Sequence, residues 1–162
     1  MQPKAQWTVE VVVDAPLKRV WEIADDITLI PHYHPDVNKV DLIAGQAKRA
    51  LGVKYQCNIL GGRRAGSCVE EVVGYEPEHR LATRMVSDTW GIVGMLADFT
   101  VEAIVSRRGE TSTNLKLRAF YKPLGLKNRL LNALILRRVL RRRSLAVMRG
   151  IKRLAEGNPA PA

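Results

Sequence analysis

Cysteine is scarce in this sequence: only Cys57 and Cys68 occur among 162 residues. They lie in separate apolar-patterned segments with no further Cys or His at ligand spacing, so we expect neither a disulfide framework nor a metal site. No apolar stretch approaches the roughly 18 residues that cross a bilayer. The N-terminal MQPKAQWTVE has no apolar core of a secretion signal. These absences predict a cytoplasmic protein with two buried free thiols.

Catalytic motifs are missing as well. The sequence contains no Gly-rich phosphate loop, no GxSxG elbow, no HExxH and no CxxC. Nucleotide hydrolysis, serine hydrolysis and zinc proteolysis are therefore unsupported, and no cofactor is expected.

The composition is that of one folded domain. Hydrophobic residues make up 46% of the chain, which is enough for a sizeable core. The net charge of +10 is confined to residues 122–156, which hold eleven basic residues and one acidic residue, whereas the remainder is neutral. Such an asymmetry is typical of a segment that meets an anionic membrane, nucleic acid or an acidic protein, or of a solvated helix face.

Alternating apolar residues predict several strands. Residues 7–13 have a period of two, and the same pattern recurs in an antiparallel meander. Its strands are expected at 37–43, 53–59, 67–75, 81–86, 96–105 and 111–121, with turns at 61–64 and 108–109. Two short helices, at 17–27 and 26–30, are expected after the first strand, the second one ending before Pro31.

From Gly125 to about Ala155 the period changes to 3.6 and predicts one long helix. Its continuous apolar stripe comprises Leu126, Leu130, Ala133, Leu136, Leu140, Ser144, Val147, Ile151 and Leu154. Arg138, Arg142, Arg149 and Arg153 lie on another face and form a basic surface. The segment 157–162 is expected to be a disordered tail, so that 1–156 form a single domain.

A long helix laid across a curved antiparallel sheet of six to seven strands is an α+β architecture. In this order, and in the segments VVVDAPLKRVWEIADDITLIPHYHPDV, EEVVGYEPEHRLATRM and FYKPLGLKNRLLNALILRRVL, the sequence resembles the START-like, helix-grip superfamily (SRPBCC). The resemblance is to its polyketide cyclase/dehydrase and coenzyme-Q-binding branch, and it covers residues 7–156. It implies a cavity between sheet and helix that holds a lipid, quinone or polyketide-like molecule. The matching segments are fold signatures and not catalytic motifs.

Strand parity and the helical stripe then indicate which side chains face that cavity. Ten residues are predicted to line it: Tyr55, Cys57, Trp90, Phe99, Val101, Leu115, Leu117, Tyr121, Leu136 and Leu140. Trp90 lies in an apolar loop with Gly91 and Gly94, which fits a cavity lid, a membrane-touching tip or a packed hairpin connection.

His32, Tyr33 and His34 lie between two prolines and are predicted at the mouth of the cavity. With Asp36 the two histidines suggest a metal site, but no third histidine is near in sequence and His79 lies in a distant turn, so no metal is expected. Glu70, Arg84, Asp98 and Glu102 interrupt apolar strands. Parity leaves their direction open, between a solvent-facing role and an inward acid or base paired with Arg84.

Three functions follow from these patterns. The first is a carrier or sensor that binds a hydrophobic small molecule and is peripheral to a membrane. The second is a cyclase/dehydratase-like lyase in which Tyr55 and an inward carboxylate or histidine activate a polyketide-like substrate. The missing catalytic motifs favour the carrier over the enzyme. The third is a module whose basic helix docks on ribosomal or other nucleic acid or on an anionic membrane. Nucleic acid is the less favoured partner, because the helix lacks aromatic residues for base stacking. The oligomeric state is left open.

Overall fold

The computed structural model describes residues 4–43, 46–60 and 65–157. The predicted turn at 61–64 and all but the first residue of the predicted tail lie outside the described residues.

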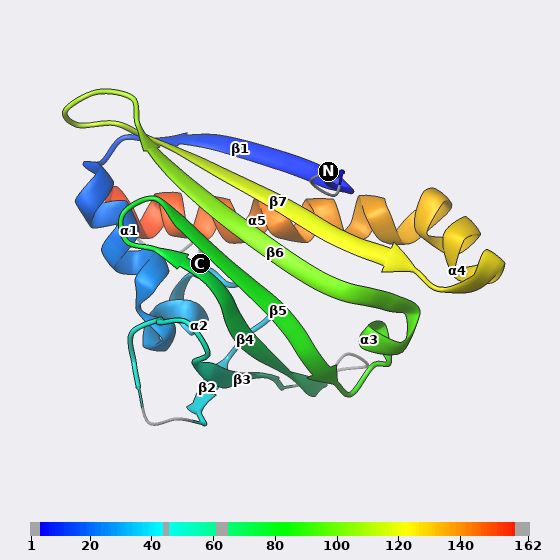
Figure 1. The fold of residues 1–162 in the computed structure, drawn as a ribbon. Helices are drawn as coiled ribbons and strands as arrows, with labels where there is room; N and C mark the ends of the chain where they lie inside the picture. The colour runs from blue at the N-terminus through cyan, green and yellow to red at the C-terminus, as the bar shows by residue number, and fades with distance from the viewer. Residues whose placement is uncertain (1–3, 44–45, 61–64, 158–162) are drawn as a thin grey trace.

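Seven strands form one antiparallel sheet in the order β1-β7-β6-β5-β4-β3-β2 (Figure 1). The strands are β1 (Trp7–Val13), β2 (Lys39–Leu42), β3 (Lys54–Ile59), β4 (Gly66–Glu76), β5 (Arg80–Asp88), β6 (Leu96–Arg107) and β7 (Thr113–Pro123). Each lies close to its predicted range, because the two-residue period of a half-buried strand is visible in the sequence. The first strand joins the last, so that β1 pairs with β7 and the sheet remains open between β1 and β2.

The helices between β1 and β2 are α1 (Leu17–Asp25), the 3₁₀ turn η1 (Ile27–Leu29) and α2 (Ile30–Tyr33). Two short helical segments were expected here and are present. The prediction that the second helix ends before Pro31 was wrong, because Pro31 occupies the first turn of α2. A proline is tolerated there because its missing N–H has no partner within the helix anyway.

The C-terminal helical region consists of α4 (Gly125–Leu131), the π-helical segment η3 (Asn132–Leu136) and α5 (Arg137–Ala155). A single-turn helix, α3 (Ile92–Met95), precedes β6. In Figure 1, α5 runs along one face of the curved sheet, and α4 projects beyond the end of β7. The predicted helix-grip α+β fold is confirmed.

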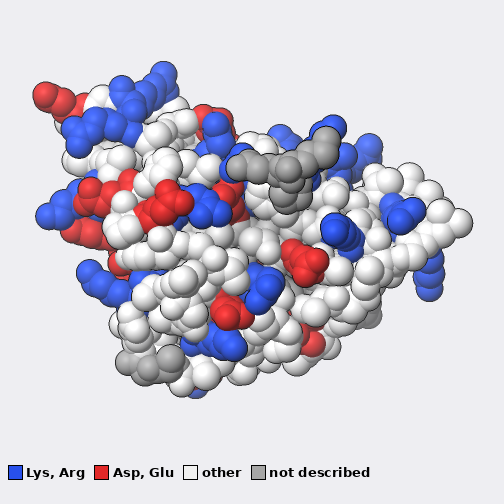
Figure 2. Space-filling model, in the orientation of Figure 1, with Lys and Arg blue, Asp and Glu red and all other residues white. Residues whose placement is uncertain are grey.

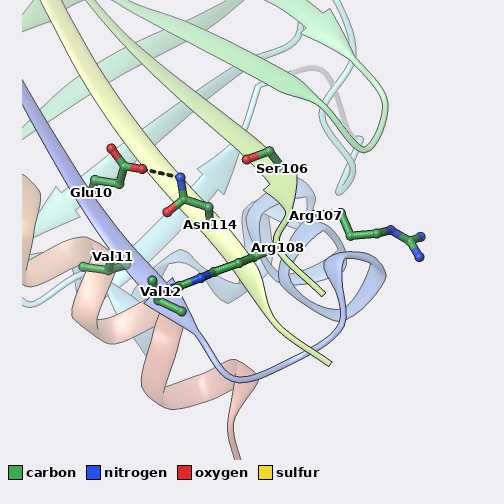
Figure 3. A pocket seen from close by; sticks show the side chains of 7 residues that line it. All are labelled: Glu10, Val11, Val12, Ser106, Arg107, Arg108 and Asn114. Carbon is green, nitrogen blue, oxygen red and sulfur yellow. Dashed lines mark hydrogen bonds between the residues drawn. The ribbon is translucent and has the colours of Figure 1, made fainter. Parts of the chain in front are cut away.

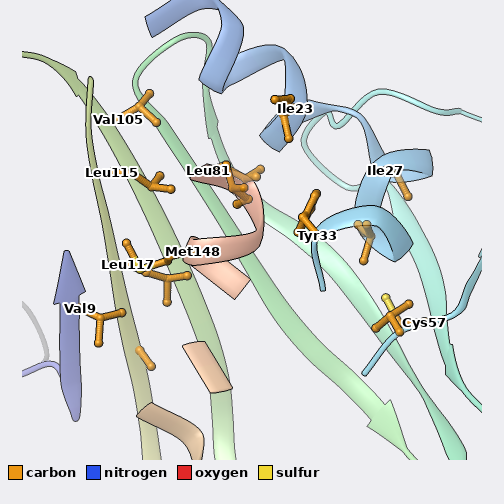
Figure 4. Close-up of a cluster of buried hydrophobic side chains, with 14 of the residues drawn as sticks. Val9, Ile23, Ile27, Tyr33, Cys57, Leu81, Val105, Leu115, Leu117 and Met148 are labelled. Atoms are coloured by element: carbon orange, nitrogen blue, oxygen red, sulfur yellow. The ribbon is translucent and has the colours of Figure 1, made fainter. Parts of the chain in front are cut away.

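The hydrophobic core lies between the sheet and α5, where Leu81, Leu115, Leu117 and Met148 meet (Figure 4). Side-chain hydrogen bonds help to hold the C-terminal helical region on the sheet. Trp7 Nε1 donates to Ser144 Oγ at 3.1 Å, and Tyr121 Oη donates to Asn132 Oδ1 at 2.5 Å. The second contact holds the buried Asn132 at the start of the π segment, the kind of local irregularity that marks functional regions of helices.

The apolar stripe is covered over only part of its length. Leu136, Leu140, Val147 and Ile151 pack against the core, but the stripe before Leu136 is exposed. The sheet therefore covers the predicted stripe only from Leu136 onward, because α4 projects beyond the end of β7. None of the helices within the described residues is long and apolar enough to cross a membrane.

Candidate ligand-binding site

A cavity of about 460 Å³ separates α5 from the concave face of the sheet. Its walls are mostly apolar and come from β1, from β3 to β7, and from the helical segments α1, α2, α3, η3 and α5. Twelve of its apolar lining residues are Trp7, Ile30, Ile59, Leu81, Met85, Ile92, Phe99, Val101, Ala103, Leu117, Val139 and Ile151. Hollows of this size with apolar walls and a few polar groups are typical binding sites for small organic molecules.

Seven of the ten residues predicted to line the cavity are found in its wall: Cys57, Trp90, Phe99, Val101, Leu117, Leu136 and Leu140. Tyr55, Leu115 and Tyr121 are buried but lie outside the lining. Both tyrosines point inward as parity predicted, yet their hydroxyl groups pair with protein side chains. Burial raises the pKa of Tyr121 to about 12.

The three predicted mouth residues separate. Tyr33 and His34 line the cavity, whereas His32 is exposed and its carbonyl oxygen accepts a hydrogen bond from Arg153 Nη2 at 3.1 Å. His34 Nδ1 accepts from the backbone N–H of Asp36 at 3.2 Å. Burial lowers the pKa of His34, so its imidazole is neutral near pH 7, with the proton on Nε2.

Asp36 and Arg143 connect the mouth loop to α5. Their Oδ2 and Nη1 atoms lie 3.5 Å apart, and both residues line the cavity. This half-buried ion pair therefore closes one side of the wall between α2 and the long helix.

The polar end of the cavity is built around Arg49, a residue that the sequence patterns did not single out. Its segment pairs with the end of α1: the backbone N–H of Arg49 donates to Asp25 O at 3.0 Å, and that of Ile27 donates to Ala47 O at 2.8 Å. These contacts turn the Arg49 side chain inward, where it lines the cavity although only 6% of its surface is exposed. No sequence signal marks this position, since the pairing joins a loop to the end of α1 and the start of η1.

The guanidinium group of Arg49 is only partly satisfied by the protein. Nη1 donates to Ala24 O, and Nη2 donates to Tyr55 Oη at 3.2 Å. Among the described residues Nε has no hydrogen-bond partner and no carboxylate lies within ion-pair distance of the guanidinium. A buried N–H group without a partner is costly, so this donor is a natural position for a ligand oxygen.

Tyr55 connects Arg49 to Glu70. Its hydroxyl group donates to Glu70 Oε2 at 2.7 Å while it accepts from Arg49. Burial raises the pKa of Tyr55 well above its ordinary value, so the phenol stays protonated. The relay places a cation and a carboxylate at one end of an apolar cavity.

Of the four charged strand residues whose direction was open, only Glu70 lines the cavity. Arg84 pairs with Glu71 at 3.2 Å, and Glu102 lies between Arg80 and Arg118. Asp98 is exposed at an irregular point of β6. The prediction of an inward acid or base paired with Arg84 is therefore wrong. Arg84 lies on the face of the sheet opposite to Glu70 and pairs with Glu71.

Cys57 and Cys68 are direct cross-strand neighbours, and both line the cavity as free thiols. Their sulfur atoms and a Glu70 oxygen lie within 4.8 Å of one another, a proximity that sequence spacing did not predict. The hydrogen bond with Cys68, together with burial, raises the pKa of Cys57. Metal ligation by this group would require the thiols to lose their protons, which a bound cation itself promotes.

A second hollow, of about 500 Å³, lies at the surface beside the β6–β7 turn (Figure 3). It is lined by residues of β1, of the adjoining ends of β6 and β7 and of the turn between them, and the side chains of Glu10 and Asn114 are hydrogen-bonded to each other. It lacks both the apolar walls and the buried polar end of the cavity.

The predicted basic surface is largely present. Arg138, Arg142 and Arg149 are exposed, and Arg153 is half-buried.

The comparisons agree with this geometry. The family model for polyketide cyclase/dehydrase and lipid transport matches residues 4–156. Comparison with curated proteins gives no sequence match. More than three hundred solved chains have a similar fold.

Three of these structures illustrate the range of the fold. Norcoclaurine synthase from Thalictrum flavum, in complex with dopamine and hydroxybenzaldehyde, has a TM-score of 0.72 at 17% identity, over 96% of this chain and 88% of that one. An aromatase/cyclase from Streptomyces sp. R1128 has a TM-score of 0.68 at 16% identity, over 93% and 92%. A START superfamily protein from Mycobacterium smegmatis has a TM-score of 0.69 at 12% identity, over 93% and 97%. At these identities the likeness concerns the fold alone.

Proposed function

This chain belongs to the polyketide cyclase/dehydrase and lipid transport family, and from that premise we propose that it binds a hydrophobic small molecule bearing a hydrogen-bond-accepting oxygen. Residues 1–156 form the ligand-binding domain, and the cavity between α5 and the sheet is the site. The proposed role is that of a carrier or sensor. The observation that carries it is the buried cation at one end of an apolar cavity: Arg49 lines that end, and within the part of the chain that the structure describes its Nε–H has no hydrogen-bond partner.

A carbonyl oxygen suits this site better than an anionic group. A ligand carboxylate beside Arg49 would also face Glu70, which the Tyr55 hydroxyl connects to the same guanidinium. A neutral carbonyl accepts the hydrogen bond without that repulsion, and the apolar walls cover the rest of the molecule. Ketones, quinones and polyketide-like compounds have this combination.

The test compares two probes of similar shape, 1-acetylnaphthalene and 1-ethylnaphthalene, by isothermal titration calorimetry. A hydrogen bond from a charged donor contributes about 1.5–3 kcal/mol, so the ketone should bind at least about tenfold more tightly. Arg49→Met should remove this preference, and Arg49→Lys should reduce it while retaining the charge. Thermal unfolding of each variant controls for loss of the fold.

The position of the probes is tested by filling the cavity. Ala103 lines the wall, so Ala103→Trp should block both probes. Equal affinities of the wild-type protein for the two probes would contradict the role of Arg49. Unchanged binding in Ala103→Trp would contradict the site.

A second candidate function is favoured by the convergence of His34, Arg49 and Glu70 on this cavity. A carboxylate near a carbonyl held by a cation can remove a proton from the adjacent carbon, because the cation stabilises the enolate oxygen. This is the first step of cyclase-type chemistry. His34 would act as a donor through Nε2, since Nδ1 already accepts a hydrogen bond.

The enzyme reading is tested by exchange of the acetyl protons of 1-acetylnaphthalene in heavy water, followed by NMR. Acceleration by the wild-type protein and its loss in Glu70→Gln, with binding retained, would support catalysis. If the protein binds the probe tightly but does not accelerate exchange, the result would contradict catalysis and favour the carrier function.

A further inference from the structure

The projecting end of the C-terminal helical region exposes large apolar side chains to solvent. Leu126, Leu130, Leu134 and Ile135 are 82%, 61%, 59% and 53% exposed. No residue of α4 is buried, so this helix contributes nothing to the core. We call the surface formed by these four residues the apolar tip.

Basic residues surround the apolar tip. Lys122, Lys127, Arg129, Arg137, Arg138, Arg141 and Arg142 are all exposed, and none of them has an acidic partner within ion-pair distance among the described residues. The chain has no acidic residue between Glu110 and Glu156. In Figure 2 this projecting end is largely white with Lys and Arg at its edges, while the red acidic groups lie elsewhere on that face.

From these two features we propose that the apolar tip docks on an anionic lipid bilayer. Leucine side chains partition into the boundary between headgroups and acyl chains, and the surrounding cations are attracted by the negative leaflet. Leu126 and Leu130 are four positions apart in α4 and share a helix face, so both enter the same bilayer.

Other occupants of this surface fit less well. The phosphate backbone of a nucleic acid would pair with the basic residues, but it would offer no apolar partner for the four exposed aliphatic side chains. A second copy of the chain would cover the leucines but would bring two basic surfaces together. A negatively charged apolar phase satisfies both features at once.

The tip is also continuous with the cavity wall. Leu136, Val139 and Leu140 follow it directly in the helix and line the cavity, and Val139 is itself partly exposed. A docked helix would therefore place the cavity wall next to the acyl chains. Membrane docking goes beyond ligand binding, because it requires none of the groups around Arg49.

The experiment is co-sedimentation of the full chain with two kinds of vesicle, one of phosphatidylcholine and one containing about one third phosphatidylserine. The wild-type protein should bind the anionic vesicles much more strongly. Leu126→Ser with Leu130→Ser should weaken this binding by about tenfold or more, since each leucine loses burial in the interface. Arg137→Gln should weaken it by about fivefold, the equivalent of about 1 kcal/mol per charge.

Matched controls lie far from the tip. Leu51→Ser removes an equally exposed leucine, 72% exposed, from the turn before β3. Arg107→Gln removes an exposed charge at the β6–β7 turn, which Figure 1 places at the opposite end of the sheet from α4. Both controls should bind anionic vesicles like the wild-type protein.

Two outcomes would overturn the proposal. Absence of binding to either vesicle excludes docking, and full binding by the double leucine variant excludes insertion of the tip.

Random duplex DNA serves as a competitor. If it displaces the protein from the vesicles and the leucine variants bind it unchanged, nucleic acid is the partner. Binding of 1-acetylnaphthalene in the cavity should be unaffected by the tip variants, so failure here is distinguishable from failure of the proposed function.

Discussion

Gly150 lies where α5 crosses α2, and a methyl group at this position should separate the two helices. A Cβ atom built on Gly150 would lie 2.0 Å from the carbonyl oxygen of Tyr33. An ordinary contact begins at 3.4 Å, so the backbone of α2 or α5 must move by about 1.4 Å. Backbone atoms yield less readily than the end of a flexible side chain.

Two opposing effects determine the stability of Gly150→Ala. Alanine favours a helix over glycine by about 0.8–1.0 kcal/mol. Overpacking of a close contact costs about 1–3 kcal/mol, and a clash with backbone belongs to the upper part of that range. We expect a net loss of about 1–2 kcal/mol, which for a chain of this size lowers the melting temperature by roughly 2–8 °C.

The assay is urea unfolding monitored by circular dichroism, with Gly94→Ala as the matched control. Gly94 lies in α3, and a Cβ there meets nothing within 4 Å. This variant should be as stable as the wild-type protein or slightly more stable. A Gly150→Ala protein that unfolds at the same urea concentration as Gly94→Ala would refute the close-approach reasoning. Since Tyr33 lines the cavity, the expected displacement should also weaken probe binding.

Three further outcomes are expected. Burial raises the pKa of Glu102, but hydrogen bonds from two arginines outweigh this effect and lower the pKa overall. Ionised Glu102 therefore stabilises the folded state at pH values above the ordinary pKa near 4.3, and this stabilisation is lost as the pH falls through the lower pKa of the folded state. In Glu102→Gln the urea midpoint of unfolding should accordingly depend less on pH across that acid range. Tyr121→Phe removes the hydrogen bond to Asn132 and should lower the free energy of unfolding by about 1 kcal/mol in the same assay. An unchanged free energy of unfolding would contradict an anchoring role for this hydrogen bond. A double-mutant cycle of Asp36→Asn and Arg143→Gln should give a coupling free energy of about 0.5–1 kcal/mol, a small value because both side chains are partly exposed. Each single variant should also release the probe faster in stopped-flow measurements. Additive effects of the two substitutions would exclude the ion pair as a closure of the cavity wall.

Much of the fold could be predicted because its elements bury one face each. The alternation at 7–13 and in the later segments indicated strands, and the change to a 3.6 period after Gly125 indicated the closing helix. The same parity correctly placed Phe99 and Leu117 in the cavity wall. The composition also located the basic segment.

Parity failed where the strands are irregular. Strand parity left the direction of Glu70 in β4 open, and the register between β4 and β5 shifts between Val72 and Gly74. On the N-terminal side of this shift Cys68, Glu70 and Val72 share the inner face. A bulge changes which face later residues occupy, and no periodic pattern marks it.

The sequence by itself determined the order of elements, the inner faces of the regular strands and the position of the positive charge, because these depend on local periodicity and composition. Only the tertiary structure decided how the polar end of the cavity is assembled. Arg49 turns inward because its loop pairs with the end of α1, and its donor meets a tyrosine from β3 that is connected to a carboxylate from β4. The structure also decided that the helix extends beyond the sheet and leaves Leu126 and Leu130 exposed. Both outcomes depend on contacts between distant segments and on the relative lengths of helix and sheet, which no local pattern encodes.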